Sequence, residues 1–282
     1  IFSTLVISPL LALLVAGVLR YSESQRYIFS EAPHIPAYIF ISLVVAMFLG
    51  LTNSANEIIR DKGMLSRERG HGIIVSQYIL SKFIILLLFS VTQSWIYLWI
   101  GNSILLIHHM TEHYMLWMVI TNLVGSSIGL LISVSIKSNK GALSLIPIII
   151  IPQILLAGAL IEYKKINPSL YFNNSASNKH IKHQVPEFCN IIPLRWSYES
   201  LIIAQNEYNL LSKSLRKIDS IKTELLKKKT PTQKDENILS QYKDAYTLLF
   251  GLKAKSHNEI TAQIEHITNS LSRNSFNSNH YL

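Results

Sequence analysis

The sequence predicts an all-α, polytopic membrane protein with a polar helical extension, and three observations support this fold class. Charged residues make up only 15% of the 282 residues, against about 25% in ordinary soluble domains, while 49% are hydrophobic. The mean hydropathy is positive, at +0.28. The apolar residues gather in long runs before residue 162, and the remainder is polar and Lys-rich. These features exclude a single soluble domain, and the lone Cys189 excludes a disulfide-built secreted module.

Five segments are long enough to cross a bilayer as helices, which needs about 20 mostly apolar residues. Helices are expected because every backbone polar group inside lipid must be paired within its own segment. The chain opens with Ile1 in place of Met, inside an apolar run, which indicates a piece of a longer protein. The predicted transmembrane domain covers residues 1–161, with spans at about 1–19, 35–56, 73–107, 114–136 and 141–161.

The distribution of Lys and Arg among the short loops predicts which face is cytoplasmic. The loop of residues 57–72 holds four basic residues and the turn of residues 137–140 holds two, whereas the opposite short loops hold two between them. Because cytoplasmic loops carry the excess of Lys and Arg, the first two loops should lie inside. Residues after 161 then lie outside, since long segments are translocated largely regardless of charge.

The region after the fifth span divides into two predicted parts. Residues 162–206 form an outer loop with a short re-entrant or interfacial helix. Residues 207–282 form an extracytoplasmic, coiled-coil-like helical region, because their apolar residues recur at spacings of three and four. These apolar stripes include Leu211, Leu215, Ile218 and Leu225; Ile238, Tyr242, Ala245, Leu249 and Leu252; and Ile260, Ile264, Ile267 and Leu271.

The loop of residues 57–72 is amphipathic and has two interpretations. Ile58, Ile59, Met64 and Leu65 give it an apolar side, and charged residues occupy the rest. As a surface helix it would offer charged residues to a soluble partner. The alternative is a positive-inside anchor that contacts only lipid headgroups.

Three motifs, in order along the chain, resemble segments of one known protein family. The run Arg67-Glu-Arg-Gly-His-Gly72 followed by Tyr78-Ile-Leu-Ser-Lys82 resembles the first cytoplasmic loop and third span of that family. The stretch from Leu145 to Gly158, with its Pro152-Gln153 pair, resembles the fifth span. The run Pro193-Leu-Arg-Trp-Ser-Tyr-Glu-Ser-Leu201 resembles a segment of the outer loop, with Ser200 where Ala is usual. Together the three motifs resemble the ABC-2 type permeases, especially the G-subfamily (White-type) ABC transporters, and the resemblance covers about residues 1–205.

The resemblance implies the membrane-spanning permease part of an ATP-driven transporter, an exporter in a bacterial inner membrane. It implies as partners an ABC nucleotide-binding domain, a second permease half and the lipid bilayer, without nucleic acid. The chain contains no Gly-x-x-x-x-Gly-Lys-Ser/Thr loop, so ATP and Mg²⁺ are expected on that nucleotide-binding domain, in the parent chain or a separate subunit. No catalytic residue or cofactor is assigned to this chain, and the family's sixth span is expected beyond it. The residues predicted to couple to the ATPase are Glu57, Arg67, Glu68 and Arg69.

Two further groups of residues are candidates for a role in transport. Polar side chains within the spans could line a translocation path, although hydrogen bonding between helices explains them about as well. A short helix is predicted to begin at Pro193, with Arg195 and Glu199 paired on one face and the Trp196 ring buried. The translocation-path candidates are Gln93, Asn122, Ser126 and Gln153, and the structural residues of the outer segment are Pro193, Arg195, Trp196 and Glu199.

Two alternatives to a transporter stay open at this stage. One is a membrane-anchored scaffold or sensor whose outer helical region binds a partner. The other is a membrane metallopeptidase, because His109-Met-Thr-Glu112-His113 matches a His-x-x-Glu-His zinc motif. That motif falls in a short loop between two spans, where no scaffold for zinc is evident, so no metal site is predicted.

Overall fold

The computed structural model describes residues 2–20, 34–68, 74–105, 107, 110–136, 138–166 and 185–209, with a few residues between 213 and 262. Over these residues the chain is helical and contains no strand, which confirms the predicted all-α class. The long helices are α1 (Phe2–Leu19), α2 (His34–Ser54), α3 (Glu57–Glu68), α4 (Val75–Leu105), α5 (Thr111–Ser135), α6 (Asn139–Leu156) and α7 (Pro193–Tyr208). Two short 3-10 helices, η3 (Tyr163–Lys165) and η6 (Glu187–Ile191), precede α7.

Among the residues that the structure describes, four helices are long and apolar enough to cross a membrane, and they lie at four of the five predicted spans. They are α2, which runs on into α3, then α4, α5 and α6. The remaining predicted span, residues 1–19, forms the apolar helix α1, whose stretch of residues 5–19 is shorter than the others. The last span ends at Leu156, a few residues earlier than predicted, because Gly158 adopts a left-handed φ of 81° and turns the chain away.

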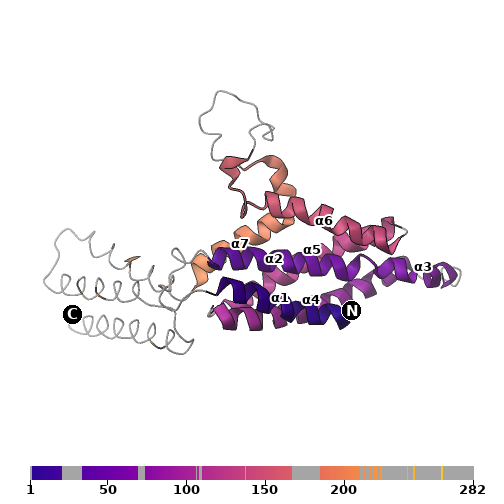
Figure 1. Ribbon diagram of the computed structural model, residues 1–282, viewed down its shortest axis with the longest axis horizontal. Coiled ribbons are helices and arrows are strands. Elements are labelled where there is room, and N and C mark those ends of the chain that lie inside the picture. Colours follow the sequence, from indigo (N-terminus) through magenta and orange to yellow (C-terminus); the bar gives the residue numbers. More distant parts are fainter. Residues whose placement is uncertain are drawn as a thin grey trace, which may run out of the picture.

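The helices are arranged around α2 and α5 (Figure 1). In Figure 1, α1 and α4 lie along one side of this central pair, and α6 and α7 lie on the other. Helix α3 continues from α2 and projects past one end of the bundle, while α7 lies toward the opposite end. Helix α6 diverges from the bundle axis and exposes several large apolar side chains, including Ile148 and Ile151.

The central pair is held by a close approach of the two helix backbones. A Cβ added at Gly50 of α2 would clash with the Asn122 carbonyl oxygen of α5. In the reverse direction, a Cβ at Gly125 of α5 would lie 2.6 Å from the Met47 carbonyl oxygen, and one at Gly129 would clash with Ser54. Small residues allow backbones to meet in this way, and van der Waals packing is a main attraction between helices in lipid.

The region after α7 is described only at isolated residues. Lys213, Arg216, Asp219, Ser220, Thr223, Ser240, Asp244 and Ala262 are helical. Arg216 folds back onto the end of α7, where its guanidinium donates to the carbonyls of Asn206 and Glu207. The apolar stripes predicted for residues 207–282 lie outside the described residues, so the coiled-coil-like arrangement stays a prediction.

Candidate functional site

Helix α3 forms the most polar helical surface of the bundle, and it is joined directly to a span. Only a two-residue turn at Ala55 and Asn56 separates it from the end of α2. Ile58 is buried, whereas Arg60, Met64 and Arg67 are exposed along one stripe at spacings of four and three. A protruding helix that packs one face on the bundle and exposes the other is suited to bind a partner.

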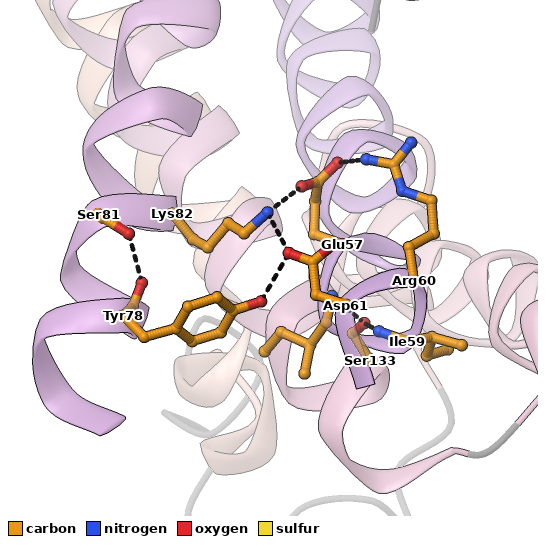
Figure 2. A network of polar contacts seen from close by, with 9 residues as sticks. Glu57, Ile59, Arg60, Asp61, Tyr78, Ser81, Lys82 and Ser133 are labelled. Carbon is orange, nitrogen blue, oxygen red and sulfur yellow. Dashed lines mark hydrogen bonds and ion pairs between the residues drawn. The ribbon is translucent and has the colours of Figure 1, made fainter. Parts of the chain in front are cut away.

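A cluster of charged residues attaches α3 to the start of α4 (Figure 2). The Lys82 ammonium of α4 lies between two carboxylates of α3, 3.0 Å from Glu57 Oε2 and 2.6 Å from Asp61 Oδ2. The Tyr78 hydroxyl donates to Asp61 Oδ2 at 2.9 Å, and Arg60 pairs with Glu57 Oε1 at 2.5 Å. Glu57 and Asp61 stand one turn apart on α3, so a single lysine bridges both.

The cluster is partly shielded from solvent, so each carboxylate in it needs a nearby positive charge. The side chains of Lys82, Glu57 and Asp61 are 18%, 10% and 25% exposed. The hydrogen-bonded Lys82 ammonium holds the pKa of Asp61 below its usual value, although partial burial opposes this. A depressed pKa means that Asp61 stabilises the fold above its unfolded-state pKa. This contribution is lost only as the pH falls through the folded-state pKa, so it is fully present at neutral pH.

Helices α3 and α5 cap each other's ends. The first N–H groups of α3 lack intrahelical partners, and the Ser133 hydroxyl oxygen of α5 accepts from Ile58 N at 2.9 Å and Ile59 N at 3.1 Å. In return, Lys62 of α3 donates to the Ile136 carbonyl at the end of α5 at 3.0 Å. A cation suits this position, because the C-terminal end of a helix carries partial negative charge. Helix α3 is therefore anchored to both α4 and α5.

Ser133→Ala is expected to loosen α3 and to lower the free energy of unfolding by about 1–2 kcal/mol, because two buried N–H groups lose their acceptor. The matched control is Ser135→Ala. The Ser135 hydroxyl is exposed and bonds only to Leu131 of its own helix, at 2.8 Å. Thermal unfolding of the purified protein in detergent measures the difference. Equal melting temperatures for the two variants would contradict the capping role of Ser133.

The structure places the four predicted coupling residues differently from one another. Glu57 is buried and faces Lys82, so its carboxylate anchors α3 and is turned away from the free face. Arg67 is exposed, with its Nε donating to the Gly63 carbonyl at 3.3 Å. Glu68 is the last residue of α3, and Arg69 lies outside the described residues.

Three residues of the anchor were not among the predicted site residues. Asp61, Lys82 and Ser133 lie in three separate segments of the sequence, which meet only in the folded chain. The four-residue spacing of Glu57 and Asp61 was the one local signal, because it places two carboxylates on one helix face. Without a known partner, a lysine near the start of a span is expected to extend toward the membrane–water interface.

The predicted translocation-path residues all lie inside the bundle of this single chain. Gln93 of α4 accepts from Asn53 Nδ2 of α2 at 3.0 Å, and Ser126 of α5 donates to the Gly50 carbonyl of α2 at 3.4 Å. Asn122 Oδ1 accepts from Ser126, while its Nδ2 has no hydrogen-bond partner among the described residues. Contacts between helices therefore account for Gln93 and Ser126, and a role in a path stays a prediction for all four residues. All four predicted path residues are buried: Gln93, Asn122, Ser126 and Gln153.

The predicted outer helix is present and is longer than expected. Pro193 occupies its first turn, and Arg195 lies 3.5 Å from Glu199 while also donating to the Asn190 side chain. Trp196 Nε1 donates to the Asn190 carbonyl at 2.8 Å, but its ring is 48% exposed and stacks near the Arg195 guanidinium. The expectation of a buried Trp196 ring was wrong, because Leu194 and Ser197 occupy the face that packs on the bundle.

The described residues contain no group of three or more His, Cys, Asp or Glu side chains arranged to hold a metal ion. His113 stacks on the Tyr208 ring, with centroids 4.6 Å apart. His109 lies outside the described residues.

Comparison with known protein families finds a match over more than half of the chain. The model of a family described as ABC-2 type transporter matches residues 1–177, which include α1 to α6 and therefore the anchored helix α3. Comparisons with curated proteins and with solved structures found no match.

Proposed function

This chain belongs to the ABC-2 type transporter family, and from that premise we propose that it is the permease part of an ATP-driven exporter in which α3 receives the force. The family and the four apolar helices make it an integral membrane protein and a membrane permease of the ABC type. The family match favours a transporter over a scaffold, a sensor or a metallopeptidase.

The observation that carries the proposal is the attachment of α3 to two different spans. A helix that transmits force from an ATPase must be rigidly joined to the helices that it moves. The Lys82 bridge joins α3 to α4, and the reciprocal caps at Ser133 and Lys62 join it to α5. On its exposed stripe, Met64 and Arg67 remain available to a partner, while Arg60 is half exposed and pairs with Glu57.

The proposed partners follow from what this chain does not supply. Its sequence lacks a phosphate-binding loop, so its residues do not fit an ATP site, and ATP and Mg²⁺ belong to an associated nucleotide-binding domain. That domain would contact α3 on the cytoplasmic face, an orientation that the basic residues of 57–72 support. A second permease half would complete the transporter in a bacterial inner membrane. Resemblance to the G subfamily supports export.

Charge reversal at the end of α3 tests the proposal. Glu68→Arg is expected to leave membrane insertion intact and to abolish substrate-stimulated ATP hydrolysis in the reconstituted complete transporter. A charge-assisted contact to the ATPase is worth about 1.5–3 kcal/mol, and reversal turns attraction into repulsion. The matched control is Glu162→Arg. Glu162 is exposed and lies beyond the C-terminal end of α6.

The experiment has three informative outcomes. Loss of stimulation in Glu68→Arg, with normal stimulation in Glu162→Arg at equal protein level, supports coupling through α3. Normal stimulation in both variants removes Glu68 from the mechanism. Absence of any ATP-dependent activity in the complete wild-type assembly contradicts the transporter itself.

A further inference from the structure

The contacts of α5 differ in kind from those of α6, and this difference bears on how the helices move. Lipid is as apolar as a leucine side chain, so apolar contacts alone do little to hold one helix against another in a membrane. Close backbone packing and hydrogen bonds between helices therefore decide which helices stay together.

Helix α5 carries such contacts at both of its ends. At one end it exchanges caps with α3, through Ser133 and Lys62. At the other end the Tyr114 hydroxyl donates to Gln205 Oε1 of α7 at 2.7 Å. Ser133 and Tyr114 stand 19 residues apart, so these attachments are separated by about 28 Å along the helix.

Helix α7 is bound to α5 by buried polar pairs at two levels. Besides the Tyr114–Gln205 contact, the Thr121 hydroxyl donates to the Ser197 hydroxyl oxygen at 2.8 Å. All four side chains are almost completely buried. Rupture of these pairs would remove two hydrogen bonds from an apolar interior, which is costly.

Helix α2 belongs to the same assembly because its close packing prevents it from sliding along α5. Its Gly50 lies against the backbone of α5, with no side chain between to adjust. It also leads into α3 through the short turn at Ala55 and Asn56. Phe40 of α2 adds an edge-to-face contact with Tyr198 of α7, with ring centroids 5.4 Å apart.

Helix α6 is attached much more weakly to this assembly. Its polar contact with α7 is the Leu194 N–H donated to Gln153 Oε1 at 3.4 Å, which is long for a hydrogen bond. Pro147 and Pro152 each remove a backbone hydrogen bond from α6, and prolines are the usual sites at which helices kink.

We propose that α2, α3, α4, α5 and α7 move as one rigid unit during the transport cycle, and that α6 moves against that unit. Helix α4 belongs to the unit because the Lys82 bridge joins it to α3. The inference rests on the proposed function, because it needs an ATPase that displaces α3. In this arrangement α5 carries the displacement of α3 to α7, and Thr121 and Tyr114 are positioning residues that keep α7 attached. The displacement that ATP causes in α3 would thereby be transmitted to the end of the bundle opposite α3.

Distances between pairs of spin labels test the proposal in the complete transporter. In a Cys189→Ser background, one pair joins α3 to α7 through Ser66→Cys and Ile203→Cys, and a second joins α3 to α6 through Ser66→Cys and Ile148→Cys. All three labelled positions are exposed. Each complex should hold a single labelled chain, and distances are compared without nucleotide and with ATP trapped by a hydrolysis-deficient ATPase.

The expected result is an unchanged α3–α7 distance and an α3–α6 distance that shifts by at least ~2 Å, the scale of helix shifts in switching proteins. An α3–α7 distance that shifts with ATP overturns the rigid unit while leaving the proposed function intact. If neither distance changes although ATP is bound, both the inference and the mechanical coupling fail.

A second variant separates transmission through α5 from simple proximity. The double replacement Thr121→Val with Tyr114→Phe removes both donors to α7, and it should make the α3–α7 distance dependent on ATP. The matched control is Ser127→Ala, an exposed residue of α5 that bonds only to Leu123 of its own helix. An ATP-independent α3–α7 distance in the folded double variant would overturn the role of these two side chains.

Discussion

Gly50→Ala is expected to prevent the bundle from folding correctly, although it adds a single methyl group. The new Cβ would clash with the Asn122 carbonyl oxygen, and both partners belong to helix backbones that cannot turn aside. Overpacking of a close-packed interior usually costs about 1–3 kcal/mol, and this site should lie at the upper end of that range. The yield of monodisperse protein after detergent extraction, and its melting temperature, measure the effect.

Gly17→Ala provides a matched control for this substitution. Gly17 also lies in an apolar helix, α1, but a Cβ built there has no neighbour within 4 Å. Alanine is a better helix former than glycine, so this variant should be at least as stable as the wild type. If the two variants extract and melt alike, the close approach of α2 and α5 is not required for the fold.

Lys82→Met is expected to have the second large effect, because it leaves Asp61 without its ion-pair partner and Glu57 with the half-exposed Arg60 as its remaining cation. Removal of one partner from a buried ion pair costs about 3–5 kcal/mol, and the partial exposure of this cluster places the cost near the lower value. Helix α3 should then detach from α4, so both the melting temperature and substrate-stimulated ATP hydrolysis should fall.

Two further variants give this prediction its controls. Lys165→Met removes the cation from an exposed pair with Glu162, whose side chains are 71% and 67% exposed, and it should change little. The triple variant Lys82→Met, Glu57→Gln and Asp61→Asn removes the carboxylate charges as well and should recover most of the lost stability. If Lys82→Met melts like Lys165→Met, the cluster does not anchor α3.

Several features of this protein were determined by local sequence alone. Long runs without charge predict membrane helices because helix length and apolarity depend only on neighbouring residues and the thickness of a bilayer. The predicted bounds of the second and fourth spans, 35–56 and 114–136, lie close to α2 and α5 for this reason. Pro193 likewise marks the start of α7, since proline suits the first turn of a helix.

The tertiary structure decided which polar residues face a partner and which hold the protein together. Glu57 resembled the other charged residues of the 57–72 loop, yet its carboxylate is buried against Lys82, 25 residues later. In the sequence, Ser133 looks like any other polar residue of a span. Only the fold brings it beside Ile58 at the start of α3, 75 residues away in sequence. The helical period restricts each residue to one face of its own helix. Which other helix covers that face depends on contacts between distant segments, and burial and the pairing of charge follow from those contacts.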